Sequence, residues 1–248
     1  MTQKVLLVDA FNLVRRIFEA RGGVAGDEFI LACRQSLQRS LLEIKPSHGV
    51  VVWDSHEVTW RHLLDDRYKA NRDPTPDVLM SLVPELTRQF SEQGILSLTV
   101  ANYEADDVIA TLALGISANQ GEAVIVSTDK MFFQLLRPGI QVYHHFDRRY
   151  VEIAEVREKF GLEINQLVDY WALSGDNSNN IKGVTGIGKK TATALLQEYG
   201  SIKAMLQDQS LKKLQADPDQ AIKCQQLVEL KVDVGLGVNL KDFRLALD

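Results

Sequence analysis

The sequence predicts an α/β fold with a central, mostly parallel sheet flanked by helices. Three short apolar runs rich in β-branched residues recur in the first 150 residues, and an acid stands at or just beyond the end of each. Such runs are typical of strands buried on both faces of a parallel sheet. Helix-like stretches lie between them, and this alternation of strands and helices indicates an α/β architecture.

The expected elements follow one another along the chain. The strands are residues 5–8, 50–53 and 124–126, and a further apolar run covers 96–100. The helix-like stretches are 29–44, 78–93 and 106–116. The segment from about His56 to Pro76 is polar and basic and directly follows a strand, so we expect an excursion from the sheet. Beyond Gly161, short helices joined by glycine turns replace the strand signal. We therefore place the α/β core at 1–160 and a helical region at 161–248.

The composition is that of an ordinary globular protein, with 45% apolar and 25% charged residues. No apolar stretch reaches the roughly 20 residues that a membrane span needs, and the start lacks the pattern of a secretory signal. Cys33 and Cys224 are isolated and lack metal spacing, which favours a reducing, cytoplasmic location. The net charge of −5 is weak guidance on a polyanionic partner, because several acids could be committed to a metal.

Acids gather where the predicted strands end. Asp9, Asp54 and Asp129 follow three separate strands, while Glu104 and Asp106 follow the apolar run at 96–100. Each one alone could be a solvated loop residue or a helix N-cap. Together they would converge, because the carboxyl ends of parallel strands share one edge, where sites form in open α/β sheets. Repulsion between such carboxylates favours a hard divalent cation with oxygen ligands.

The spacing of Glu104 and Asp106 sets a geometric condition. Two residues apart on a regular helix, the two side chains would point about 200° apart. Both can face one metal only if Glu104 precedes the helix and Asp106 lies in its first turn. Asp107, by contrast, could serve only to complement the helix dipole.

A glycine-rich turn at 183–188 has the pattern of a helix-hairpin-helix and is followed by Lys189, Lys190 and Thr191. Gly186 and Gly188 permit a tight turn and a close approach of the backbone to a phosphate. The next helix would present its N-terminal amides, and the lysines add positive charge. The turn could also be a helix-helix connection without a ligand.

Taken in order, these residues resemble the 5′-nuclease or flap-endonuclease superfamily. The resemblance spans residues 9–192, most of the chain. It rests on the hairpin and on the strings Val8-Asp9-Ala10, Val52-Trp53-Asp54, Trp60-Arg61-His62, Arg67-Tyr68-Lys69-Ala70-Asn71-Arg72, Tyr103-Glu104-Ala105-Asp106-Asp107, Ser127-Thr128-Asp129-Lys130 and Leu173-Ser174-Gly175-Asp176.

The resemblance implies a PIN-like core, a helical arch at about 56–90 and a set of functional residues. It implies a first metal, Mg²⁺ (or Mn²⁺), at Asp9, Asp54, Glu104 and Asp106 with Asp129 close by, and Asp176 as a second-metal ligand. Lys69 and Arg72 would contact the scissile phosphate, with Arg61 as a further DNA contact. The hairpin would grip duplex DNA through residues 186–191 and hold K⁺ on the carbonyls of Lys182, Val184 and Ile187.

The sequence departs from the family pattern at the second metal site. Met131 and Asn179 stand where that pattern has acids, so two formal negative charges are missing. We therefore expect an eroded second metal site.

The function expected is hydrolysis of phosphodiester bonds in branched or 5′-flap DNA by a cytoplasmic monomer. Two rivals stay open: a degenerate module that binds branched DNA without cutting, and a PIN-like ribonuclease, which the hairpin disfavours. A phosphatase of the haloacid dehalogenase type is disfavoured because Phe11, not aspartate, follows two residues after Asp9.

Overall fold

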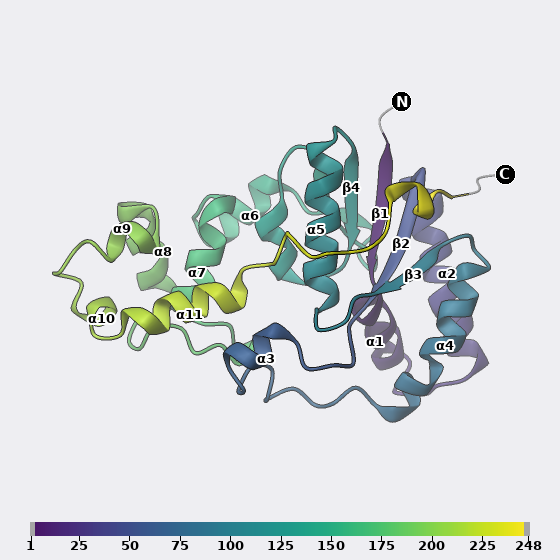
Figure 1. Ribbon diagram of the computed structural model, residues 1–248, viewed down its shortest axis with the longest axis horizontal. Coiled ribbons are helices and arrows are strands. Elements are labelled where there is room, and N and C mark those ends of the chain that lie inside the picture. Colours follow the sequence, from purple (N-terminus) through teal and green to yellow (C-terminus); the bar gives the residue numbers. More distant parts are fainter. Residues whose placement is uncertain (1–2, 246–248) are drawn as a thin grey trace. The chain divides into compact units, whose positions relative to one another are not determined.

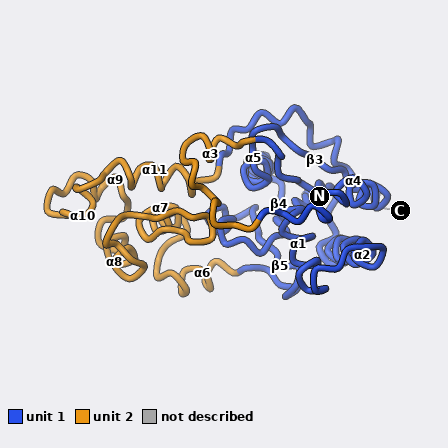
Figure 2. Tube along the Cα trace, turned by 90° about the horizontal axis from the view of Figure 1, so that it is seen from below, with its two compact units in different colours: residues 1–57, 74–151, 231–248 blue, residues 58–73, 152–230 orange. Residues whose placement is uncertain are grey.

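The computed structural model describes residues 3–245, and the chain divides into two compact units. Unit 1 comprises Met1–Glu57, Pro74–Val151 and Lys231–Asp248, and unit 2 comprises Val58–Asp73 and Glu152–Leu230 (Figure 2). Each unit therefore joins segments that are distant in the sequence. The single boundary near residue 160 stays a prediction.

Unit 1 contains a six-stranded sheet in the order β3-β2-β1-β4-β5-β6. All neighbouring strands are parallel except β5 and β6. This arrangement confirms the predicted α/β class. The strands are β1 (Lys4–Asp9), β2 (His48–Trp53), β3 (Leu96–Thr99), β4 (Glu122–Val126), β5 (Ile140–His144) and β6 (Arg149–Tyr150).

Helices cover both faces of this sheet (Figure 1). One face packs against α1 (Ala10–Ala20), α2 (Asp27–Ile44) and α4 (Asp77–Ser91), and the other packs against α5 (Ala105–Ala118). Side chains alternate between the faces, as a strand requires: Leu6 and Val8 join the core beneath α1, α2 and α4. Val5 and Leu7 are equally buried on the α5 side, so β1 is apolar throughout.

Register brings the ends of β1 and β2 together. Asp9 is the last residue of β1 and pairs with Val52, one residue before the end of β2, so Asp54 follows immediately beyond. β4 pairs with β1 on its other side and ends at Val126. The register therefore places Asp9 and Asp54 at one edge of the sheet, where β4 also ends.

Unit 2 is helical in its described residues. Its elements are α3 (Trp60–Leu64), α6 (Ile153–Phe160), η2 (Ile164–Gln166), α7 (Leu167–Ser174), η3 (Asn177–Asn179), α8 (Lys189–Tyr199), α9 (Ile202–Met205), α10 (Lys212–Gln215) and α11 (Pro218–Val228). α7 packs against both α8 and α11. Unit 1 adds the short turns η1 (Lys130–Leu135) and η4 (Leu240–Phe243).

The predicted arch at 56–90 is divided by the structure. Residues 58–73 belong to unit 2 and contain α3, which packs against α11. Residues 77–90 instead belong to α4, whose Leu79, Leu86 and Phe90 are buried in the core of unit 1. The excursion from the sheet therefore ends before α4, because that helix has an apolar face to bury.

Residues 231–245 form a strap in unit 1 that is anchored on α5. Asp107 is fully buried, and its Oδ1 accepts a hydrogen bond of 2.9 Å from the Lys231 amide. The Thr111 hydroxyl accepts a hydrogen bond from the Val234 amide at 3.3 Å. Asp107 thus holds the strap in addition to lying in the first turn of α5. Over residues 3–245, no helix is long and apolar enough to cross a membrane.

Gly183 is a position where only glycine fits, which gives a stability prediction. Its φ is +71°, and an added Cβ would lie 2.4 Å from the Gly175 nitrogen and 2.6 Å from the Leu173 oxygen. We expect Gly183→Ala to lower the free energy of unfolding by about 3 kcal/mol or more, a fall in Tm of roughly 6–12 °C. Gly188→Ala is the control, because nothing lies within 4 Å of its Cβ position. A similar, small Tm change in both variants by calorimetry would contradict this packing.

Candidate functional site

The carboxylate of Asp9 is held in place at the end of β1. Asp9 is buried, and its Oδ1 accepts a hydrogen bond from the Asn12 amide at 3.1 Å, which caps α1. Its Oδ2 accepts a hydrogen bond from the Ser127 hydroxyl at 2.9 Å. Both oxygens of this acid are therefore oriented by neighbouring residues.

The loop after β4 is tied to the same place. The Ser127 hydroxyl also accepts a hydrogen bond from the Asp129 amide, at 3.1 Å. The Asn12 side-chain oxygen accepts from the Thr128 amide and hydroxyl, at 3.0 and 3.1 Å. These hydrogen bonds join the end of β4 to the start of α1 and so fix Asp129 relative to Asp9.

The start of α5 is tied to the end of β2. The Ala105 amide donates a 2.7 Å hydrogen bond to Oδ1 of Asp54. Glu104 is the N-cap residue of α5 with an extended backbone, and Asp106 lies in the first turn. The geometric condition deduced from their spacing is therefore met, and both acids lie next to the residue that binds Asp54.

The crowding of these acids is visible in the electrostatics of Asp9. Burial, with the negative charges of Asp54 and Asp129, raises the pKa of Asp9 to about 7, against the lowering effect of its hydrogen bonds from Asn12 and Ser127. A buried carboxylate next to two others favours a proton or a cation.

A divalent cation fits this donor set. Among residues 3–245, no three His, Cys, Asp or Glu side chains are grouped closely enough for a complete metal site. Mg²⁺ does not need such a group, because it usually keeps several waters and uses one or two carboxylates plus substrate phosphate. The donors are carboxylate oxygens on a partly buried, negatively charged edge, which suits a hard cation rather than zinc.

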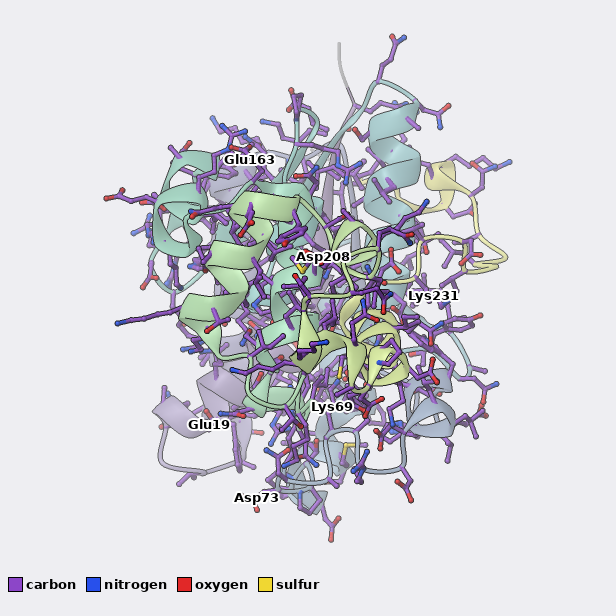
Figure 3. All side chains as sticks on the ribbon, turned by 90° about the vertical axis from the view of Figure 1, so that its left-hand side faces the viewer. Glu19, Lys69, Asp73, Glu163, Asp208 and Lys231 are labelled. Atoms are coloured by element: carbon purple, nitrogen blue, oxygen red, sulfur yellow. The ribbon has the colours of Figure 1, made fainter. Side chains whose placement is uncertain are left out.

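Asp176 and the basic residues of the excursion lie in unit 2. Asp176 and Asn179 are both buried in the turn around η3. Lys69 and Arg72 belong to the loop after α3, and Figure 3 labels Lys69 and Asp73 on this loop. The Lys69 amide donates to the Asn179 carbonyl at 3.0 Å. Residues 67–72 and the turn 176–180 are therefore brought together within this unit.

Arg61 is buried, with only 2% of its surface exposed. Its Nε donates to the Leu227 carbonyl at 2.9 Å and its Nη2 donates to the Glu229 carbonyl at 3.1 Å. The guanidinium also lies 4.4 Å from the centroid of the Trp60 ring. Its donors thus cap the end of α11, and the guanidinium offers no open surface for the DNA contact expected from the sequence. The role we propose for Arg61 is to hold α3 on α11.

The hairpin has the local structure expected of a phosphate-contacting turn. Gly188 is the N-cap of α8, and Lys189, Lys190 and Thr191 are exposed in its first turn. Gly186 has a φ of +78° and its carbonyl accepts a 2.8 Å hydrogen bond from Nζ of Lys213. The side chains of Val184 and Ile187 are buried and fix the turn. The roles of its amides in DNA binding and of its carbonyls in K⁺ binding stay predictions.

Two features of the site are not evident from the sequence. Asn12 and Ser127 orient the acids, and the only sequence signal for them is a polar residue beside a predicted strand-end acid. Met131 is 4% exposed in η1, so its side chain packs among the buried residues of unit 1. Position 131, where the family pattern has an acid, therefore carries a methionine that packs in the interior.

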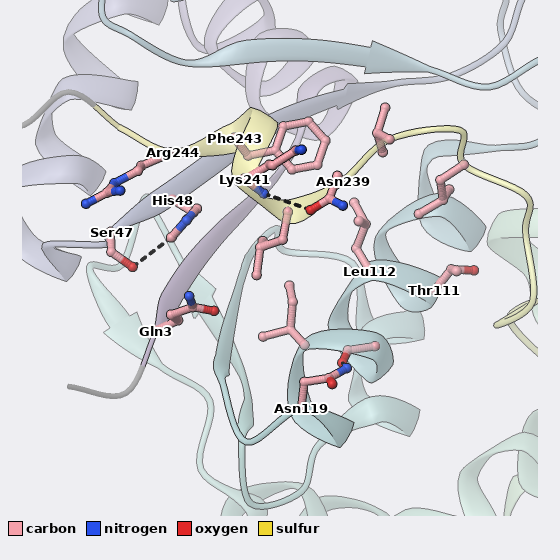
Figure 4. Close-up of a pocket in the computed structure, with 15 residues that line it drawn as sticks. Gln3, Ser47, His48, Thr111, Leu112, Asn119, Asn239, Lys241, Phe243 and Arg244 are labelled. Atoms are coloured by element: carbon pink, nitrogen blue, oxygen red, sulfur yellow. Dashed lines mark hydrogen bonds between the residues drawn. The ribbon is translucent and has the colours of Figure 1, made fainter.

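A cavity of about 850 Å³ in unit 1 lies away from these acids. It is lined by residues that precede or begin β1 and β2, including Gln3, Ser47 and His48, and by the strap around η4 (Figure 4). These residues are at the amino ends of strands whose carboxyl ends carry Asp9 and Asp54. None of the expected site residues lines this cavity.

Comparison with known proteins connects this geometry to a family. Residues 4–161 match the family described as 5′-3′ exonuclease, N-terminal resolvase-like domain. Residues 162–247 match 5′-3′ exonuclease, C-terminal SAM fold. The flap endonuclease Xni of Psychromonas ingrahamii is 41% identical over 256 residues, with 98% of both chains covered.

Solved structures share the fold. A T5 5′-exonuclease with bound divalent metal ions (zinc) has a TM-score of 0.78 at 21% identity, covering 92% of this chain and 90% of that one. A T5 flap endonuclease complex with DNA and metal ions has a TM-score of 0.76 at 20% identity, covering 91% of this chain and 89% of the other. The resemblance seen in the sequence strings is thereby confirmed, and the chain belongs to the 5′-3′ exonuclease family, with an N-terminal resolvase-like domain and a C-terminal SAM fold.

Proposed function

We propose that this protein is a structure-specific 5′ nuclease that hydrolyses phosphodiester bonds in branched, 5′-flap DNA with a divalent metal ion. The observation that carries the proposal is the set of acids at the carboxyl edge of the sheet, where the buried Asp9 lies close enough to Asp54 and Asp129 for their charges to raise its pKa. Near full-length similarity to flap endonuclease Xni supports the substrate class. The T5 flap endonuclease complex with DNA and metal ions, a neighbour in fold, supports the same interpretation.

Asp9, Asp54, Glu104 and Asp106, with Asp129 nearby, are the residues that we assign to the divalent ion. When bound, the ion supplies Lewis acidity for attack on phosphorus and for departure of the leaving oxygen. Mg²⁺ is the ion we favour over Mn²⁺. The chain keeps the oxygens of Asp9 oriented through Asn12 and Ser127, and an oxygen of Asp54 through the Ala105 amide. Fixed ligands need no reorganisation during the reaction.

The basic residues contribute charge. Lys69 and Arg72 are assigned to the scissile phosphate, where they would offset the negative charge that develops during hydrolysis. Asp176 is assigned to a weak second metal site recruited together with substrate phosphate. The first turn of α8 is assigned to the duplex backbone, with K⁺ on the carbonyls of Lys182, Val184 and Ile187.

We further propose that the protein is a cytoplasmic monomer. Both cysteines are buried free thiols, as suits a reducing compartment.

The metal assignment is tested with Asp54→Asn, which keeps an acceptor oxygen for the Ala105 amide while removing the charge. We expect cleavage of labelled 5′-flap DNA in Mg²⁺ to fall about 10³-fold or more, since the ion contributes several kcal/mol. Binding of the same DNA without metal should be unchanged. Asp147→Ala, which removes an exposed acid from unit 1, is the control. If Asp54→Asn cuts the DNA at the rate of the unmodified protein, the assignment of Asp54 to the metal is wrong. Tight binding without any cutting by the unmodified protein favours a binding module.

The hairpin assignment concerns Lys189 and Lys190. Replacing both with Ala should weaken binding to duplexes of any sequence, because contacts to the DNA phosphate backbone carry no sequence information. The slope of log K against log salt should flatten by about 0.9 for each phosphate that the protein no longer neutralises. Lys159→Ala with Lys203→Ala removes equal charge from exposed positions on α6 and α9. If the Lys189/Lys190 variant and the Lys159/Lys203 variant give the same slope of log K against log salt, the hairpin is only a structural turn.

A further inference from the structure

The turn around η3 uses an amide where the family pattern has an acid. Asn179 is 4% exposed, and its Nδ2 donates a 2.8 Å hydrogen bond to Oδ2 of Asp176. The Ser178 hydroxyl donates to the other oxygen, Oδ1, at 2.7 Å. Both oxygens of the buried Asp176 carboxylate are therefore bound by neutral donors from its own turn.

The same amide also receives the guanidinium of Arg72. Nη2 of Arg72 donates to Oδ1 of Asn179 at 2.7 Å, and its Nε donates to the Ser178 carbonyl at 2.8 Å. This pair of hydrogen bonds fixes the plane of the guanidinium on the turn. The side chain of Asn179 thus joins Asp176 to Arg72.

Three more hydrogen bonds join the loop after α3 to this turn. The Lys69 amide donates to the Asn179 carbonyl at 3.0 Å, Nδ2 of Asn71 donates to the Asn177 carbonyl at 2.8 Å, and Nδ2 of Asn180 donates to the Arg67 carbonyl at 2.7 Å. Lys69 has a φ of +56°, a conformation that lysine rarely adopts and that persists only where neighbours hold it. The docked loop supplies that restraint.

An amide at position 179 satisfies both partners, and a carboxylate does not. It donates with Nδ2 and accepts with Oδ1, whereas a carboxylate only accepts. An aspartate would still accept from Arg72, but its charge would face the Asp176 carboxylate without a hydrogen between them. Asn179 therefore completes an alternative polar arrangement and is more than a missing metal ligand.

We propose that Asn179 is a positioning residue that fixes the Arg72 guanidinium on the Asp176 turn, so that this positive charge is set in place by hydrogen bonds within the chain. The proposal rests on the proposed function for the role of Arg72 at phosphate. The arrangement is made by hydrogen bonds within the chain, so it can be measured separately, without DNA or added metal.

Amide hydrogen exchange of the full chain in EDTA tests the positioning directly. We expect Asn179→Ala to speed exchange in the 67–72 segment about tenfold, because removing the Arg72 acceptor loosens the loop. Asn177→Ala is the matched control, since its side chain is exposed and the loop uses only its carbonyl. Asn179→Asp keeps an acceptor for Arg72 and should keep the segment more protected than Asn179→Ala does. Equal exchange in Asn179→Ala and the unmodified protein overturns the proposal.

A second variant covers the case in which Asn179→Ala does not fold. Arg72 is exposed, so Arg72→Met removes the other partner with little effect on the core. It should give the same rise in exchange, and the double variant should add nothing more. Additive effects, or no effect of Arg72→Met, overturn the proposal.

Cleavage of 5′-flap DNA then separates this inference from the proposed function. Asn179→Ala should lower kcat about tenfold with little change in KM, and Asn177→Ala should not. A rise in KM with kcat unchanged overturns the positioning role. If the unmodified protein cuts no DNA, the proposed function fails, and the exchange results still decide whether Asn179 positions Arg72.

Discussion

Repulsion between carboxylates held at one edge of a parallel sheet is the constraint on which this structure depends. The registers of β1 with β2 and of β1 with β4 place Asp9, Asp54 and the approach to Asp129 together. Burying like charges is costly, and the fold answers with hydrogen bonds from Asn12 and Ser127 to Asp9. The residual cost shows in the raised pKa of Asp9. A divalent cation at these acids, as we propose, would offset this cost.

The same constraint explains which parts could be predicted from sequence. Strands buried on both faces leave an unmistakable apolar run, and acids at their ends stand out, so β1, β2, β4 and the acids beyond their carboxyl ends could be found. The Glu104–Asp106 spacing even located the start of α5. Two features, the last strand of the sheet and the role of Arg61, could not be found from the sequence. The short β6 has no run to detect, and Arg61 resembles a DNA contact because sequence does not reveal that a cation is buried against helix carbonyls.

The departures from the family pattern have different physical meanings. Met131 is buried, so an acid there would place a charge in the core of unit 1, and its neighbours Phe132 and Phe133 are buried as well. The amide of Asn179 donates a hydrogen bond to Asp176 and accepts one from Arg72, so it joins the two side chains. One change is thus a packing solution, while the other exchanges a charge for two directed hydrogen bonds. Sequence alone shows both simply as missing acids, because the distinction depends on contacts made across the fold.

The central claim is that the strand-end acids repel one another until a divalent ion joins them, and thermal unfolding with Mg²⁺ tests it most directly. At pH 8 in EDTA, Asp9→Asn should unfold at a higher temperature than the unmodified protein, because one crowded charge is gone. Mg²⁺ at about 100 times its dissociation constant should stabilise the unmodified protein by about 2.7 kcal/mol, roughly 5–10 °C in Tm. The same Mg²⁺ should shift Asp9→Asn far less. Equal shifts in both proteins, or a less stable Asp9→Asn in EDTA, would contradict the account.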